Sequence, residues 1–539
     1  MSGSITLENR FGVNKMELIS LKYAIFVIVL LVLYYCFPKK YRWYVLLAGS
    51  MAYYVIICKW YVLFIIFTIC TTYGSTIWID KLLKEQNAIV KSHKEDWDRQ
   101  TRKEYKEKGR KKRVAVMLFA LLCNFGILAF LKYIPYAGEL GLLLPLGISF
   151  YTFQSMGYVM DVYREIVEPE KNFLKVALFV SFFPQIIQGP IAIYDKLAGQ
   201  LYEGHSLRLE NLQKGALLVL WGVMKKLVIA DRAVNIINLV MDKPMDFSGT
   251  YVFFAAVVYA LQLYADFSGG IDIVRGIAEM FGITMSTNFN HPYFSRSLTE
   301  YWHRWHMTLG DWCRNYIFYP LSISKRFLNF GKWLKPRFGA HISKVLPGCI
   351  ASVITFIVIG VWHGANMKYL YFGLWNGIVI MLAELFAPVN KKVAGGFFKL
   401  TGLREKGIFA TIVSVLWTFM LILVGYYFDI AANASTAFHM LFKSVTDFHI
   451  SELGINNIIL NLGACGLDKY DILLLIICTL LWFFISFVEE NKKLDMRDFI
   501  LSRKLPLRWA IIYLGIFIVI IFGYYGPGVN PADFVYMQF

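Results

Sequence analysis

Charged residues are scarce in this chain. They make up 17% of its 539 residues, whereas hydrophobic residues make up 57% and aromatic residues 17%. Soluble domains usually contain about 25% charged residues, so this composition excludes an ordinary soluble enzyme. We therefore expect an integral membrane protein, in contact with membrane lipid.

Cysteine motifs are absent as well. The eight cysteines are scattered, mostly inside apolar stretches, and they have neither the spacing of a metal site nor that of a disulfide framework. The sequence contains no glycine-rich nucleotide-binding loop. We expect no metal and no bound cofactor, and no residue can be named as cofactor-binding.

Apolar stretches recur along the whole chain, and a spanning helix needs about 20 such residues. Several stretches are short or interrupted by polar residues, which is typical of re-entrant segments surrounded by protein or by a water-filled cavity. We expect an all-α polytopic membrane protein with about eleven spans, the first of them a signal anchor, plus one or two re-entrant segments. The stretches are residues 18–37, 43–58, 61–79, 114–131, 142–160, 176–193, 216–229, 251–264, 346–362, 369–386, 408–427, 472–488 and 511–525.

The net charge of +18 is concentrated between the apolar stretches. The basic loop 81–113 contains 13 Lys and Arg against 6 Asp and Glu, and further basic loops follow at 325–344, 391–406 and 492–508. By the positive-inside rule these segments are cytoplasmic. This pattern indicates membrane topology rather than nucleic-acid binding, and it could also dock an acidic carrier protein. The segment 429–471 has two basic residues and five acidic ones, so we place it outside, together with the C-terminal tail 526–539.

A single imidazole, His363, interrupts an almost wholly apolar stretch. Ionisable groups at membrane depth usually face a cavity or a pathway, because lipid does not solvate them. A neutral imidazole there could accept a proton from a hydroxyl group that attacks an ester or thioester. The alternative is a histidine that is simply satisfied by a neighbouring helix.

The most polar region lies between Asp266 and Pro320 and contains His303, His306 and several tryptophans. Structural ion pairs on an amphipathic connection would explain many of its charges. Together with His363 the two histidines could in principle form a three-histidine metal site. No further ligand lies at a recognisable spacing, and we therefore predict no metal.

Six short segments follow one another between residues 144 and 385: LPLGISFYTFQ from Leu144, FPQIIQGP from Phe183, DFSG from Asp266, NFN from Asn288, WHMTL from Trp305 and WHG from Trp362. As an ordered set they are more specific than any one alone. Together they resemble the membrane-bound O-acyltransferase (MBOAT) family, in the bacterial branch that contains the alginate O-acetylation protein AlgI and the teichoic-acid D-alanylation protein DltB.

The resemblance implies a helical funnel with a tunnel between the two membrane faces. The family's buried histidine matches His363, and its second histidine matches His306 rather than His303. We expect His363 to be the base and His306 to orient the donor or share the proton. The expected tunnel residues are Gln185, Asp266, Ser268, Asn288, Trp305 and Trp362.

The chain ends in an FxYxxF pattern, Phe534 to Phe539. It resembles the ending of the small single-span protein DltX, which works beside DltB. A phenol is a better leaving group than an aliphatic alcohol, so Tyr536 could accept an acyl group and pass it on. The alternative is an aromatic tail at the membrane interface.

We interpret the chain as an O-acyltransferase of the bacterial cell membrane. The donor would be a cytoplasmic thioester, acetyl-CoA or an acyl carrier protein, and the group would be acetyl or D-alanyl. The acceptor would be an extracytoplasmic polysaccharide or cell-wall polymer, reached with a separate extracytoplasmic transferase. There are two alternatives: a transporter, and an acyltransferase that acts on lipid or on a secreted protein. We divide the chain into N-terminal helices (1–143), an MBOAT core (144–390), C-terminal helices (391–508) and a last span with its tail (509–539).

Overall fold

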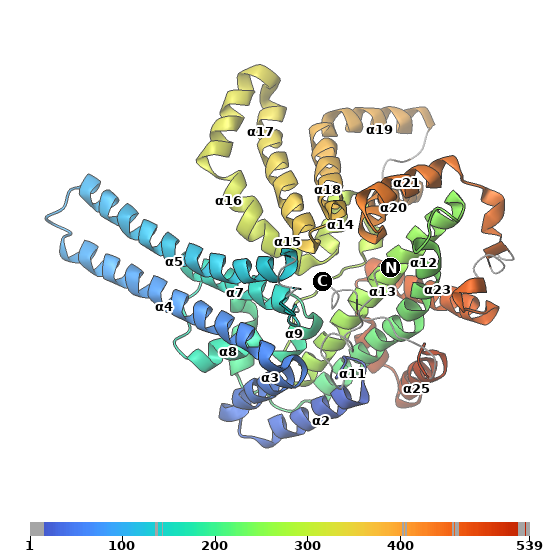
Figure 1. The fold of residues 1–539 in the computed structure, drawn as a ribbon, viewed down its shortest axis with the longest axis horizontal. Coiled ribbons are helices and arrows are strands. Elements are labelled where there is room, and N and C mark those ends of the chain that lie inside the picture. The colour runs from blue at the N-terminus through green and yellow to red at the C-terminus, as the bar shows by residue number, and fades with distance from the viewer. Residues whose placement is uncertain are drawn as a thin grey trace. The chain divides into compact units, whose positions relative to one another are not determined.

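Helices make up all the regular secondary structure of the residues that the computed structural model describes, which confirms the all-α prediction (Figure 1). These residues are 16–134, 138, 140–142, 144–401, 404, 407–454, 457–458, 463–526 and 534, with the backbone alone for 397–400 and 464. They form two compact units. One comprises residues up to 219 together with 271–286, and the other comprises 220–270 together with 287 onward.

Seven of the described helices are long and apolar enough to cross a membrane, and a bent pair, residues 367–396, is an eighth candidate. Their surfaces carry many exposed apolar side chains, and α25 (Leu505–Phe522) has no buried residue at all. Such surfaces are stable in lipid but not in water. The structure therefore confirms a polytopic membrane protein, while the count of about eleven spans stays a prediction.

The first unit contains nine helices of appreciable length within its described residues, the last of which runs on into the second unit. A buried α7 contacts α4, α5, α8 and α9. The expected span 176–193 is divided into two short buried helices, α8 and α9, by the extended backbone of Phe182. The helices are α2 (Leu21–Cys36), α3 (Arg42–Cys58), α4 (Val62–Ser92), α5 (Arg99–Tyr133), α7 (Ile148–Tyr163), α8 (Phe173–Ser181), α9 (Phe183–Gln188), α10 (Tyr194–Tyr202) and α11 (Leu209–Met224).

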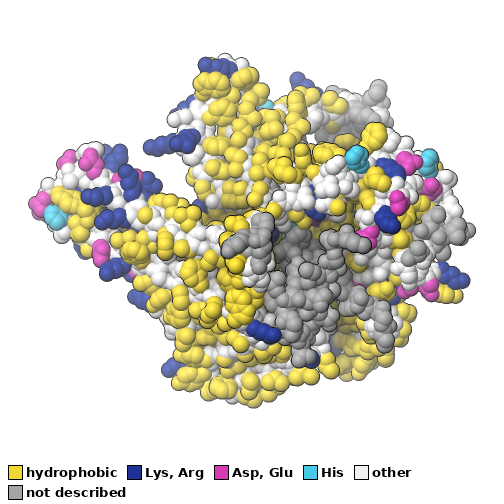
Figure 2. Space-filling model, viewed as in Figure 1, with side chains coloured by type: hydrophobic (Ala, Val, Ile, Leu, Met, Phe, Trp, Pro, Cys, Tyr) yellow, Lys and Arg dark blue, Asp and Glu magenta, His cyan; other side chains and the backbone are white. Residues whose placement is uncertain are grey.

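The basic segment 81–113 is mostly helix rather than the irregular loop we expected. It forms the adjoining ends of α4 and α5, which pack side by side (Figure 1). Lys, Arg, Glu and Gln favour helix, and the Asp98 side chain caps α5 by accepting from the backbone N–H groups of Gln100 and Thr101. Figure 2 shows Lys and Arg side chains gathered at this end of the hairpin.

The second unit contains the other helices. The expected span 216–229 is α11 followed by a π-helix, η3 (Lys225–Ala230), and a second π-helix is η5 (Arg314–Phe318). The α-helices are α12 (Asp231–Met241), α13 (Gly249–Met280, which ends in the first unit), α14 (Leu298–Arg304), α15 (Met307–Cys313), α16 (Tyr319–Ser322), α17 (Lys325–His363), α18 (Met367–Leu385), α19 (Ala387–Thr401), α20 (Ile408–Ile430), α21 (Ala434–Thr446), α23 (Lys469–Lys492), α24 (Met496–Leu501) and α25 (Leu505–Phe522).

Helices α17 and α18 form the most extensive helix pair. Their backbones approach closely at glycines, since a Cβ atom on Gly360 would overlap the Tyr369 carbonyl oxygen and one on Gly373 would overlap that of Phe356. Small residues at helix contacts allow this approach in membranes. Helix α17 ends at His363, and α18 begins at Met367 after a short connection. The close packing of the two helices therefore fixes the position of His363.

We predict that Gly360→Ala destabilises the protein, because the added methyl group pushes α17 away from α18. Gly348→Ala, on the same helix, is the matched control, since its Cβ would meet no atom within 4 Å. The measurement is the thermal midpoint of the purified protein in detergent. A lower midpoint for Gly360→Ala alone is expected, and equal midpoints for the two variants would contradict the close approach.

Candidate active site

His306 occupies a strained backbone position between two short helices, α14 and α15. Its φ and ψ are 44° and 50°, in the left-handed region that non-glycine residues rarely adopt. Two backbone hydrogen bonds hold this connection to the NFN segment: Asn290 N–H donates to Arg304 O at 3.0 Å, and Met307 N–H donates to Asn288 O at 2.9 Å. Strain of this kind persists only where the surroundings enforce it, and it is common at functional sites.

The Asn288 side chain sets the tautomer of the His306 ring. Asn288 Oδ1 accepts from the Thr308 backbone N–H at 3.1 Å and from the Thr308 hydroxyl at 2.8 Å, so this atom is an acceptor. The same oxygen lies 3.2 Å from His306 Nδ1. Nδ1 therefore carries the proton, and Nε2 has the lone pair of the neutral ring.

Burial keeps that ring neutral. His306 is 2% exposed. It lies between α14 and α15, which have seven residues each and are too short to span a membrane. Removal from water lowers the pKa of His306 from 6.5 to about 3. The imidazole is thus an uncharged hydrogen-bonding group throughout the physiological pH range.

His363 is the last residue of α17 and is 9% exposed. Its ring centre lies 4.8 Å from that of Trp362, 5.9 Å from that of Tyr369 and 5.5 Å from that of Phe372. Gly364 ends the helix against the Tyr369 ring. Aromatic rings from α17 and α18 therefore fix the orientation of this imidazole.

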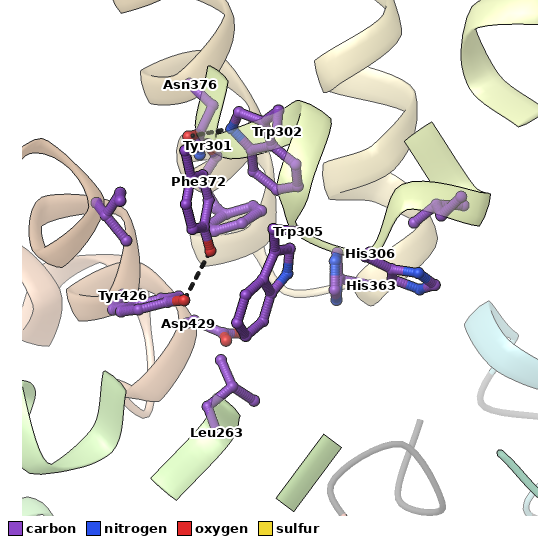
Figure 3. A pocket seen from close by; sticks show the side chains of 12 residues that line it. Leu263, Tyr301, Trp302, Trp305, His306, His363, Phe372, Asn376, Tyr426 and Asp429 are labelled. Atoms are coloured by element: carbon purple, nitrogen blue, oxygen red, sulfur yellow. Dashed lines mark hydrogen bonds between the residues drawn. The ribbon is translucent and has the colours of Figure 1, made fainter. Parts of the chain in front are cut away.

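The two histidines line one pocket within the second unit (Figure 3). Trp362 connects them, since its ring centre is 6.3 Å from that of His306. The cavity volume is about 20 Å³, which is room for about one or two water molecules. The other lining residues are Leu263, Tyr301, Trp302, Trp305, Leu309, Phe372, Asn376, Ile422, Tyr426 and Asp429.

Comparison with known proteins identifies part of this region. Residues 169–335 match the MBOAT, membrane-bound O-acyltransferase family. This stretch of the chain is therefore similar to membrane-bound O-acyltransferases. The matched residues include Asn288 and His306, whereas His363 lies beyond them.

The relatives belong to the predicted bacterial branch of that family, which confirms the resemblance to AlgI and DltB. Over 313 residues the chain is 30% identical to the probable alginate O-acetylase AlgI of Pseudomonas syringae pv. tomato, covering 58% of this chain and 54% of that protein. It is 29% identical to the peptidoglycan O-acetyltransferase of Helicobacter pylori, covering 51% and 56%. It is 26% identical to the teichoic acid D-alanyltransferase of Bacillus subtilis, covering 52% and 67%. The chain thus spans little more than half the length of the first two proteins.

The predicted site residues fall into separate places. His306, His363 and Trp305 line the pocket, Trp362 contacts both imidazole rings, and Asn288 bonds to His306. Tyr536 lies outside the described residues. Gln185 is in the first unit, where its side-chain amide donates to Gln154. The exposed His303 is not among the lining residues.

Asp266 and Ser268 belong to a buried charged cluster rather than to the pocket lining. Lys226 Nζ lies 2.7 Å from Asp266 Oδ1 and 2.8 Å from Asp231 Oδ1, and Lys225 Nζ donates to Ser268 Oγ at 2.8 Å. All five side chains are nearly inaccessible. Paired charges of this kind are the usual way in which a buried lysine is tolerated.

Several pocket residues were not predicted from the sequence. Asp429, at the end of α20, accepts from the Tyr259 hydroxyl at 2.7 Å. Tyr426 connects the hydroxyls of Tyr293 and Tyr301, at 3.1 and 2.8 Å. An acidic residue at the end of an apolar stretch was a signal for Asp429, but the tyrosines resemble ordinary core residues.

The described residues contain no group of three or more His, Cys, Asp or Glu side chains that could hold a metal ion. The side chains that line the pocket supply two imidazoles, one carboxyl group, one amide and several phenols and indoles.

We predict that His306 makes the protein sensitive to acid. Its pKa is about 3 in the folded state and near 6.5 in the unfolded chain, so the unfolded chain binds a proton that the folded state excludes. The contribution to stability is complete above pH 6.5 and decreases as the pH falls, by about 2 kcal/mol at pH 5. Thermal unfolding in detergent between pH 7 and 5 measures it. His306→Asn, which tolerates the left-handed backbone, should reduce this pH dependence, and an unchanged dependence would refute the assignment.

Proposed function

We propose that this protein is an O-acyltransferase of the bacterial cell membrane. It transfers an acyl group from a cytoplasmic thioester to an extracytoplasmic polysaccharide or cell-wall polymer, with its C-terminal tail outside. The observation that carries this proposal is the pocket in which His306 and His363 meet from different helices. The match to the MBOAT family and the named activities of the relatives support it.

The two imidazoles have different roles in the proposed reaction. A general base is most effective when its pKa is near the ambient pH, and a pKa of about 3 makes His306 a weak base. His306 Nε2 instead accepts a hydrogen bond and orients the accepting hydroxyl group. His363 removes the hydroxyl proton as the oxygen attacks the thioester carbonyl. The new C–O bond forms, the C–S bond breaks, and the proton passes to the departing thiolate.

The small cavity favours a short acyl group over a long one. The cavity is small and its walls are tryptophan and tyrosine rings held by hydrogen bonds, such as the one from Trp302 Nε1 to Asn376 Oδ1 at 3.0 Å. A long acyl chain would require these rings to move. We propose acetyl as the transferred group and D-alanyl as the alternative, since relatives named for both groups match the chain.

The C-terminal tail is the proposed relay. Tyr536 would receive the acyl group as a phenyl ester and pass it to a separate extracytoplasmic transferase. The supporting contact is at Phe534, two residues earlier, which is 5% exposed within the second unit. The donor, acetyl-CoA or an acyl carrier protein, would approach the basic cytoplasmic segments such as the end of the α4–α5 hairpin.

We predict that His363→Ala reduces polymer acylation by at least about 100-fold, because general-base catalysis contributes factors of that size or more. The measurement is the amount of base-labile acyl ester in the polymer fraction of cells that express each variant at the normal level. His303→Ala is the matched control, since this exposed histidine is on the adjacent helix. Full acylation with His363→Ala would exclude His363 as the base.

The relay predicts a second effect. Tyr536→Phe removes only the hydroxyl group that would accept the acyl group, so polymer acylation should fall to background while the protein level stays unchanged. Incubating the purified chain with a radiolabelled acyl thioester should leave base-labile label on the wild-type chain and none on the variant. Equal labelling of both chains would rule out an acyl-Tyr536 intermediate.

A further inference from the structure

The last described residues of the chain are held to the buried cluster around Lys226. The Tyr524 backbone N–H donates to Leu227 O at 2.9 Å, inside the π-helix η3. Arg232 donates to Phe522 O at 3.0 Å, and its guanidinium lies 5.5 Å from the centre of the Tyr524 ring. The end of α25 is therefore fixed to η3 and α12 through backbone atoms as well as side chains.

Phe534 makes the most specific of these contacts. Lys226 Nζ lies 4.5 Å from the centre of the Phe534 ring, and both residues are nearly inaccessible, at 3% and 5% exposure. The electron-rich face of an aromatic ring attracts a cation, and it does so more strongly away from water. Asp231 and Asp266 hold the same ammonium group, so its position is fixed before the ring approaches.

This cluster is directly connected to the histidine pocket. Asp266 and Phe267 are adjacent on α13, and while Asp266 binds Lys226, the Phe267 ring lies 4.9 Å from the His306 ring. Phe267 itself is completely buried. The contact at Phe534 is thus connected to His306 through Lys226, Asp266 and Phe267.

We propose that Lys226 is a positioning residue for the C-terminal tail: its ammonium group, oriented by Asp231 and Asp266, docks the Phe534 ring and so presents the end of the chain to the acyl-transfer site. This inference rests on the proposed function. Docking residue 534 limits the reach of the residues that follow it. An aliphatic side chain at 534 fills the space but has no π face, so the aromatic ring is the specific requirement.

The test replaces the ring rather than the lysine, because removing Lys226 would leave two buried carboxylates unpaired. Phe534→Leu removes the cation–π contact, and Phe534→Tyr retains it as the matched control. The first measurement is the rate at which carboxypeptidase removes the C-terminal residues of the full-length protein in native membranes. We expect at least a 10-fold faster release from Phe534→Leu and a wild-type rate from Phe534→Tyr. Equal rates for all three chains would overturn the docking.

The second measurement separates positioning from a structural role. Purified Phe534→Leu should hydrolyse a radiolabelled acyl thioester, or transfer the group to an added phenol such as N-acetyltyrosine amide, at the wild-type rate, because the histidine pocket is intact. Polymer acylation in cells should fall at least 10-fold, with recovery in Phe534→Tyr. Loss of both reactions would overturn the proposal in favour of a folding defect. Faster release of the C-terminal residues together with normal polymer acylation would support the contact between Phe534 and Lys226. It would refute the acyl relay through the C-terminal tail.

Discussion

The side-chain amide oxygen of Asn288, Oδ1, is the atom on which the arrangement of the pocket depends. It accepts from the backbone and side chain of Thr308 and from His306 Nδ1, so one buried acceptor determines both the course of the chain after His306 and the tautomer of the ring. Such an arrangement is most effective away from water, where each hydrogen bond is stronger and each missing one more costly. The side chain of a residue 18 positions earlier thereby decides which nitrogen of His306 faces the chemistry.

The pocket is built almost entirely from groups that carry no charge at neutral pH. Trp305, Tyr426 and Tyr301 provide hydrogen-bonding edges on apolar rings, which suits a site within a membrane protein. Asp429 supplies the one carboxyl group, and its partner is the Tyr259 hydroxyl. A thioester carbonyl that enters such a pocket loses its water, and the attacking hydroxyl is then surrounded by fixed dipoles rather than by mobile solvent.

The sequence was most informative where a residue contradicted its surroundings. A histidine in an apolar stretch and an ordered set of polar motifs led to His363, His306 and Trp305, which line the pocket, and to Asn288 and Trp362, which contact its histidines. Asp266 and Ser268 were expected to line the tunnel. Their partners are Lys226 and Lys225, about 40 residues earlier in the chain, and no local pattern reveals this long-range contact. Tyr426 was overlooked because a tyrosine at helical spacing usually belongs to a core. The basic segment 81–113 was expected as a loop, since charge indicates topology but does not exclude helix.

The burial of His306 has a consequence for how the pocket holds charge. Two imidazoles that share a small cavity would ordinarily titrate as a coupled pair, each opposing the protonation of the other. With one ring kept out of that equilibrium by burial, the cavity carries at most one positive imidazole during a catalytic cycle. In the proposed reaction, the proton that leaves the accepting hydroxyl group can therefore reside only on His363. It must leave that ring before the next acyl group can react.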